Sequence, residues 1–214
     1  GGGGDNITDP FFLNDSTVLR ARAYNSASGE WSALNEAIFS IDTVPANESN
    51  LVVSEFHYRP ADPATPGELA VTSDRDDFEF LELLNIGASA LQMNDVRFAA
   101  GINFSFPENV VLGVGESVLL VRDRAAFESR YGVATGLSFE YTGRLSNDGE
   151  QIVILGSEAG VIKDFTYNDQ APWPTEADGE GRSLVLIDPA GNPDHGNALS
   201  WRASKALGGS PGTS

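Results

Sequence analysis

The sequence predicts an all-β protein that folds as a sandwich or a barrel. Its apolar residues occur in short runs, alternating or continuous, and Gly, Pro, Asn and Asp separate one run from the next. Only one segment has the apolar spacing and the end residues of a good helix. Short strands at regular intervals with turns between them are typical of these two β architectures.

The composition of the 214-residue chain indicates a folded core and excludes several classes of protein. Hydrophobic residues make up 41% and charged residues 21%, which is typical of a globular domain and not of an acidic disordered tail. With 13 Lys and Arg against 31 Asp and Glu, the net charge of −18 argues against nucleic acid as a partner. No stretch approaches the roughly 20 apolar residues of a membrane span, so we expect no membrane insertion. The absence of cysteine excludes disulfides, thiolate metal sites and a cysteine nucleophile.

The first part of the chain, residues 1–45, is predicted to hold an N-terminal β-hairpin and a linker. Two alternating runs at 16–24 and 37–41 form its strands, and a turn-like segment at 25–29 lies between them. A lone hairpin is marginally stable in water, so this part is expected to be a piece of a larger module or to dock on the next part.

The main sandwich is predicted over residues 46–190. It contains one short helix at 123–131, for which Asp123 is the N-cap. Residues 191–214 are mostly turn formers and predict an irregular C-terminal tail that frays from Gly208 onward. The expected strands of the sandwich are 51–58, 78–85, 96–98, 103–106, 117–121, 151–155, 161–167 and 182–187.

An ordered series of motifs, covering about two thirds of the chain, matches a known family. The series is VSEFHY at 53–58, FEFLELLN at 78–85, FSFP at 104–107, LGVGE at 112–116, LLV at 119–121, LSNDGEQI at 145–152, Tyr167, PWP at 172–174, DGEG at 178–181 and SL at 183–184. This order of motifs resembles the lamin tail domain family in its bacterial extracellular branch. The runs at 18–23 and 31–34 resemble the end of an immunoglobulin-like module that often precedes the domain in such proteins.

The resemblance implies an immunoglobulin-like β-sandwich of the lamin-tail type. It also implies a non-catalytic binding or scaffolding module of a secreted or cell-surface bacterial protein with several domains. The implied partner is a protein or a cell-surface or glycan component, and the implied location is extracellular or at the cell surface. No catalytic residues are carried over. The nucleic-acid contacts of the lamin branch depend on basic surfaces, which the charge of this chain does not support.

Two acidic loops are candidate metal sites. Asp74, Asp76 and Asp77 lie just before Glu79, and Asp178 belongs to a second acidic patch. Carboxylate oxygens are the ligands that Ca²⁺ prefers, so calcium is the one cofactor that these acids suggest. The spacing does not match an EF-hand loop. Solvated acidic loops are the alternative interpretation, because charge runs are usually solvated.

Glu55, Glu79 and Glu82 are unusual because they interrupt apolar strands. Side chains alternate between the two faces of a strand, so Glu79 and Glu82 are predicted to point to opposite faces. An inward carboxylate needs an Arg, backbone N–H groups or a cation as its partner. Because acids are rarely fully buried, the simpler interpretation places each of them at a strand end or a solvated edge.

Trp31, Trp173 and Trp201 have two interpretations. An exposed indole can stack on the face of a sugar, which makes Trp173 and Trp201 candidate ligand-binding residues. Tryptophan is usually largely buried, however, and the rigid segment at 172–174 is suited to covering the end of a sandwich. Packing is therefore the alternative role for both.

Two other functions compete with the non-catalytic module. The first is a calcium-dependent carbohydrate-binding module, which requires an exposed tryptophan beside acidic groups. The second is a metal-dependent hydrolase fragment that uses Glu79, Glu82 and nearby Asp residues, and it requires carboxylates that converge on one cleft. A hydrolytic triad would need His57 or His195, the only histidines of the chain.

Overall fold

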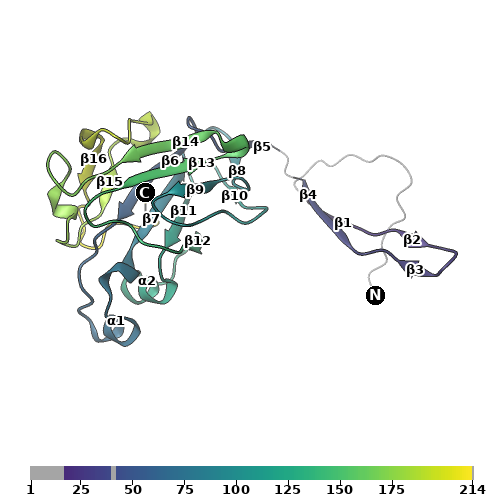
Figure 1. The fold of residues 1–214 in the computed structure, drawn as a ribbon, viewed down its shortest axis with the longest axis horizontal. Helices are drawn as coiled ribbons and strands as arrows, with labels where there is room; N and C mark the ends of the chain where they lie inside the picture. Colours follow the sequence, from purple (N-terminus) through teal and green to yellow (C-terminus); the bar gives the residue numbers. More distant parts are fainter. Residues whose placement is uncertain (1–16, 40–41, 214) are drawn as a thin grey trace. The chain divides into compact units, whose positions relative to one another are not determined.

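The computed structural model describes residues 17–39 and 42–213, and it is mostly β-sheet with few helices. The chain divides into two compact units between Thr43 and Val44. Figure 1 shows the strands of each unit. The predicted all-β class is confirmed at this level.

The first unit is a long hairpin. Strand β1 (Thr17–Ala21) pairs antiparallel with β4 (Asn35–Phe39), and β2 (Tyr24–Asn25) pairs antiparallel with β3 (Glu30–Trp31). Gly29 closes the turn with a φ of +73°, a value that favours glycine. The predicted hairpin is therefore present in the described residues, whereas positions 16, 40 and 41 of its expected strands lie outside them.

The second unit is organised around a sheet of six strands. Its order is β12 (Leu137–Glu140), β11 (Ser117–Val121), β7 (Phe80–Asn85), β6 (Leu51–His57), β15 (Leu184–Leu186) and β16 (Trp201–Ala203). Neighbouring strands are antiparallel except for β11 and β12, which are parallel. Strands β6, β7 and β11 are almost wholly buried, because the sheet is covered on both faces.

A sheet of three strands packs against one face of the six-stranded sheet and encloses the main core. Its order is β14 (Val161–Thr166), β13 (Gln151–Leu155) and β9 (Arg97–Ala100). Phe56 of β6 meets Phe165 of β14 at 6.3 Å between ring centroids, and Leu81, Leu120 and Ile152 are fully buried in the same cluster. A smaller sheet follows the order β10 (Val111–Leu112), β8 (Ala90–Gln92) and β5 (Thr43–Pro45).

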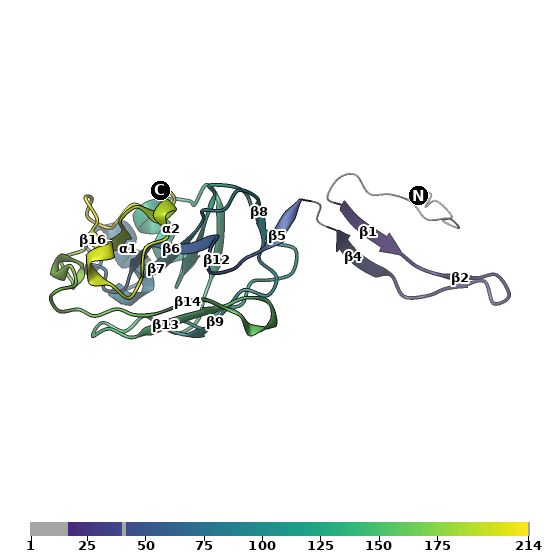
Figure 2. The same ribbon diagram turned by 90° about the horizontal axis from the view of Figure 1, so that it is seen from above.

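Helix α2 (Arg124–Tyr131) packs on the other face of the six-stranded sheet, and α1 (Pro66–Val71) contacts α2 (Figure 2). Helix α2 confirms the predicted helix, since the Asp123 carboxylate accepts the N–H of Ala126 at 2.7 Å and Gly132 ends it at a φ of +81°. A second cluster of buried side chains lies beneath it: Phe80, Leu119, Val121 and Phe127.

The expectation of a single short helix was wrong. Helix α1 lies in the segment 59–77, between the expected strands at 51–58 and 78–85, and Thr65 and Glu68 form a reciprocal capping box at its start. Residues 42–213 also contain five short 3₁₀ turns: η1 (Arg75–Phe78), η2 (Ser157–Ala159), η3 (Thr175–Ala177), η4 (Pro189–Gly191) and η5 (Ala198–Ser200). None of the helices in the described part of the chain has the length and hydrophobicity that a bilayer crossing requires.

The structure also differs from the expected boundaries. The expected strand at 103–106 makes only isolated bridges, from Asn103 to Thr142 and from Ser105 to Arg97. The C-terminal part, 191–214, was expected to be an irregular tail, but it belongs to the second unit and supplies β16 to the main sheet. The second unit therefore includes the whole of this part and not only residues up to 190.

Candidate functional site

Strands β6 and β7 carry two glutamates in directly opposite positions. Glu55 is paired with Glu82 in the register of the sheet, and an irregularity between Val53 and Glu55 leaves Ser54 as a β-bulge. Both glutamates are buried, with exposed fractions of 1% and 0%. The next pair on the same face of the sheet is His57 and Phe80, and Phe80 packs on the α2 side of the sheet. The two carboxylates therefore lie on the face that the helices partly cover.

The last residues of the chain close over these two carboxylates. We call residues 208–213 the C-terminal strap. The backbone N–H of Ser210 donates to Glu55 Oε1 at 2.7 Å, and the Ser210 hydroxyl donates to Glu55 Oε2 at 2.7 Å. The backbone N–H of Gly212 donates to Glu82 Oε2, also at 2.7 Å. Figure 2 shows the C-terminal end of the chain on the same side of the sheet as α2.

The sheet itself supplies further donors to the same two carboxylates. The Ser183 hydroxyl donates to Glu55 Oε1 at 2.5 Å, and the hydroxyl of the bulged Ser54 donates to Glu82 Oε1 at 2.6 Å. Burial raises the pKa of Glu55, and the negative charge of Glu82 acts in the same direction, whereas the hydrogen bonds from Ser183 and Ser210 oppose the shift. Burial and the nearby acid thus outweigh the donors that favour its charged form.

The strap fits this place through its backbone conformation. The segment Ser210-Pro211-Gly212-Thr213 is a tight turn, in which the N–H of Thr213 donates to the carbonyl of Ser210 at 3.1 Å. Gly212 has a φ of +74°, as expected for glycine in the third position of a turn that has proline in the second. Gly209 has no room for a side chain, because a Cβ would overlap Glu55 Oε1 and lie 2.8 Å from Ser183 Oγ.

The hydrogen bonds of the C-terminal strap differ from the frayed end that the sequence predicts from Gly208 onward. The segment 208–212 has the spacing Gly-x-Ser-x-Gly, a pattern typical of a nucleophilic serine on a turn between a strand and a helix. Here the turn lies between no such elements, and Ser210 donates to a carboxylate. No hydrogen bond joins Ser210 to either histidine within the described residues, so the spacing marks a docking segment and not a triad.

Glu79 points to the opposite face of the sheet, as predicted. Its Oε2 accepts hydrogen bonds from the Tyr141 hydroxyl and from the backbone N–H of Leu145, both at 2.9 Å. The side chain has an exposed fraction of 0%, and burial raises its pKa to about 8. All three unusual glutamates are thus buried. Glu79 does lie at a strand end, directly before β7, but the expectation that these acids are solvated was wrong.

The residues predicted to bind a metal ion are not gathered into a single cluster. Each of the five carboxylates instead has a partner within the chain. Three of them form ion pairs with arginine: Asp76 with Arg144 at 3.2 Å, Asp77 with Arg122 at 3.3 Å and Asp178 with Arg59 at 2.5 Å. Asp74 accepts a hydrogen bond from the backbone N–H of Asp76. Glu79 accepts hydrogen bonds from Tyr141 and Leu145. No group of three or more His, Asp or Glu residues lies close enough to hold a metal ion in the part of the chain that the structure describes.

The candidate sugar-binding residues Trp173 and Trp201 lie in the core. Their exposed fractions are 8% and 3%, and their ring centroids are 6.3 Å apart. The indole N–H of Trp201 donates to the carbonyl of His195 at 2.9 Å. The packing interpretation thus agrees with their burial, and neither ring presents a face to a sugar. In the first unit, Trp31 is 53% exposed and packs beside Tyr24.

Both histidines are buried in uncharged positions. Burial lowers the pKa of His57 to about 3, and the positive charge of Arg130 adds to that effect. Burial also lowers the pKa of His195 to about 4. His195 Nε2 accepts the backbone N–H of Val53 at 3.2 Å, and its Nδ1 lies 2.9 Å from the carbonyl of Pro193. This geometry requires a neutral ring, so His195 connects the C-terminal part to β6.

Two surface hollows flank the C-terminal strap. The larger, of about 610 Å³, lies at the turn end of the strap and is lined by residues that include Leu119, Phe127, Leu137 and Pro211. The smaller, of about 320 Å³, lies at the other end, beside Gly208 and Arg130. The strap therefore lies between two hollows, one beside α2 and the sheet and the other between α1 and α2. We call the place that it fills over Glu55 and Glu82 the strap groove.

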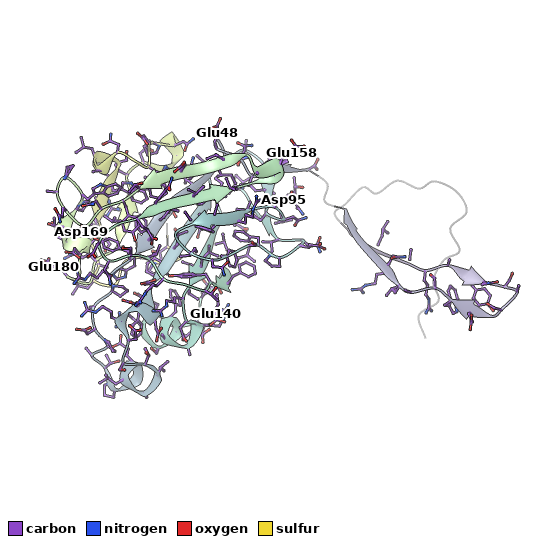
Figure 3. All side chains as sticks on the ribbon, in the orientation of Figure 1. Glu48, Asp95, Glu140, Glu158, Asp169 and Glu180 are labelled. Carbon is purple, nitrogen blue, oxygen red and sulfur yellow. The ribbon has the colours of Figure 1, made fainter. Side chains whose placement is uncertain are left out.

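The acids outside these sites are spread over the body. Figure 3 shows labelled acids around the outline of the second unit: Glu48, Asp95, Glu140, Glu158, Asp169 and Glu180. Such dispersed charge is typical of a soluble surface and does not define one binding patch.

Comparison of the chain with protein-family models, with curated proteins and with solved structures gave no match. The function must therefore be argued from the residues and their arrangement.

Proposed function

We propose that this chain is a non-catalytic binding and scaffolding module of a secreted or cell-surface bacterial protein with several domains. The ordered motifs of its second unit resemble those of the lamin tail domain family. Two packed sheets over one core, with Phe56 of one against Phe165 of the other, fit the immunoglobulin-like sandwich that this resemblance implies. A protein or a cell-surface or glycan component is the proposed partner.

One observation carries the non-catalytic part of the proposal. Glu55, Glu79 and Glu82 have the burial that often tunes a catalytic acid, yet each of them accepts hydrogen bonds from the chain itself, Glu79 through Oε2 alone. Glu55 and Glu82 hold the C-terminal strap, and Glu79 holds the segment that contains Tyr141 and Leu145. Because Glu79 and Glu82 point to opposite faces, they do not converge on one cleft.

The two competing functions have less support. A hydrolase that uses Glu79 and Glu82 needs both carboxylates at one substrate, which their opposite faces prevent. A calcium-dependent carbohydrate-binding module needs an exposed aromatic platform, and Trp173 and Trp201 are buried. Trp31, in contrast, is exposed. The experiment below therefore tests carbohydrate binding through Trp31 as an alternative.

The experiment exposes the purified chain to three probes. These are a panel of chromogenic glycosides, esters and phosphates, a glycan array with and without calcium, and an array of bacterial envelope and host extracellular components. We expect that the chain turns over none of the chromogenic substrates and that it binds one component of the arrays. The Glu79→Gln variant is expected to bind that component as strongly as the wild type does. Turnover that is lost in a correctly folded Glu79→Gln chain would contradict the proposal. Glycan binding that needs calcium and is lost in Trp31→Ala would instead establish the carbohydrate-binding alternative.

A further inference from the structure

The C-terminal strap contacts the second unit as a bound peptide ligand does. Ser210 and Gly212 present backbone N–H groups to two carboxylates at 2.7 Å, and the Ser210 hydroxyl adds a third bond of the same length. Hydrogen bonds from an N–H or O–H donor to a carboxylate are among the stronger ones in proteins. The acceptors, Glu55 and Glu82, belong to β6 and β7, which are central strands of the six-stranded sheet. The strap therefore binds to the core of the fold.

The strap groove selects the sequence of the segment that it holds. Gly209 is required because a Cβ there would overlap Glu55 Oε1 and lie 3.0 Å from the Phe80 ring. Ser210 is selected by its hydroxyl, which reaches the second oxygen of Glu55. Gly212 is favoured by its φ of +74°. The contacts therefore favour glycine at position 209, serine at position 210 and glycine at position 212.

The connection between the strap and the body is exposed. Lys205, Ala206 and Leu207 are all exposed to solvent, and Leu207 is 72% exposed. Hollows flank the strap at both ends. The side chains of this short connector are thus accessible, while its backbone is held at two points, because the carbonyls of Lys205 and Ala206 accept hydrogen bonds from Arg182 and Ser204 at 2.7 Å.

We propose that the strap groove, floored by Glu55 and Glu82, is a peptide-binding site for a Gly-Gly-Ser-Pro-Gly segment. The chain's own residues 208–212 fill it as an intramolecular ligand, and the same segment of a second copy of the chain is the ligand that replaces it. A second copy carries identical donors on an identical connector, so the exchange preserves every contact. The proposal goes beyond the proposed function, because peptide exchange is measurable whatever other partner the module has.

The lysines of this 214-residue chain allow a direct experiment. Its only lysines are Lys163 and Lys205, and Lys163 is buried, with its Nζ donating to the carbonyl of Glu48 at 2.7 Å. A lysine-specific protease is therefore expected to cut the folded chain after Lys205 and to leave residues 206–214 attached by non-covalent contacts alone. A fluorescent synthetic peptide of residues 206–214 is then added to the cut protein, and fluorescence anisotropy measures its binding. The matched control is the same peptide with Gly209→Ala.

We expect the wild-type peptide to displace the cut segment and bind, and the Gly209→Ala peptide to bind at least about tenfold more weakly. The proposal is overturned if the cut protein keeps its circular-dichroism spectrum but binds neither peptide, or binds both equally. If cutting unfolds the second unit, the peptide-binding measurement uses the uncut Gly209→Ala chain instead of the cut protein. The strap groove of this variant is unchanged, whereas its own strap fits poorly. Binding of the wild-type peptide to that chain supports the proposal, and no binding contradicts it.

Discussion

Glu55 and Glu82 lie opposite each other on neighbouring strands, and the C-terminal strap supplies hydrogen bonds to both. Two acids in directly opposite positions normally destabilise a sheet. Here hydroxyl and backbone N–H donors from the strap, from Ser183 and from the bulged Ser54 offset that repulsion. The strap is therefore a structural part of the second unit, and its loss would leave two buried acids without several of their donors.

Replacing Glu55 by alanine is expected to destabilise the fold by about 2–4 kcal/mol, because the change leaves donors of Ser183 and Ser210 buried and unpaired. Urea unfolding at neutral pH measures the free energy. Glu108→Ala is the control, since Glu108 is exposed, and we expect it to change the stability by less than about 0.5 kcal/mol. Equal stabilities of the two variants would show that Glu55 does not hold the strap.

Replacing Gly209 by alanine separates steric fit from backbone strain. Gly209 and Gly115 have positive φ values of +88° and +71°, so alanine at either position costs about 1 kcal/mol in backbone strain. A Cβ at Gly115 meets no atom within 4 Å, whereas one at Gly209 overlaps Glu55. We expect Gly209→Ala to lower the unfolding free energy by a further 1–3 kcal/mol or so. Equal effects in thermal unfolding would contradict the close fit of the strap.

Glu79 is expected to make stability depend on pH. Burial raises its pKa to about 8 from an ordinary 4.5, so the folded state holds this proton more tightly than the unfolded state. The resulting stabilisation is fully present below pH 4.5 and is lost as the pH rises through about 8. Relative to Glu79→Gln, the wild type should lose up to about 1.4 kcal/mol per pH unit in this window.

The measurement is urea unfolding of both proteins at about pH 5, 6.5 and 8, where the pKa difference predicts the change. Taking the difference between the two proteins cancels the titration of the buried histidines. A constant difference across the three pH values would mean that Glu79 ionises normally in the folded chain.

The three tryptophans should differ in their access to solvent. Trp31 is 53% exposed, whereas Trp173 and Trp201 are 8% and 3% exposed. Acrylamide is therefore expected to quench one class of tryptophan strongly, and Trp31→Phe should remove that class. Strong quenching that persists in Trp31→Phe would instead place Trp173 or Trp201 at the surface and restore the sugar-platform interpretation.

The sequence predicted those parts of the fold whose determinants are local. Helix α2 is identifiable because Asp123 and Gly132 mark its ends, and β6 and β11 are identifiable as short runs of β-forming residues. Helix α1 could have been found as well, because its capping box, Thr65 with Glu68, is a local pattern. The three prolines of that segment instead favoured the interpretation of a loop.

The candidate site could not be predicted because its contacts are far apart in the sequence. Ser210 reaches Glu55 across 155 positions, and Gly212 reaches Glu82 across 130. The segment 208–213 is made mainly of glycine, serine and proline, so it has no hydrophobic periodicity that would indicate burial. Its docking depends on two carboxylates that the sequence pattern alone placed at solvated positions.

The most direct test is hydrogen exchange at the backbone amides of Ser210 and Gly212, followed by NMR in the wild-type chain. If these amides donate to the buried carboxylates of Glu55 and Glu82, they should exchange at least about a hundredfold more slowly than in an unfolded peptide. Exchange at the unfolded rate, while the amides of β6 and β7 stay protected, would contradict the conclusion that the buried glutamates hold the C-terminal strap.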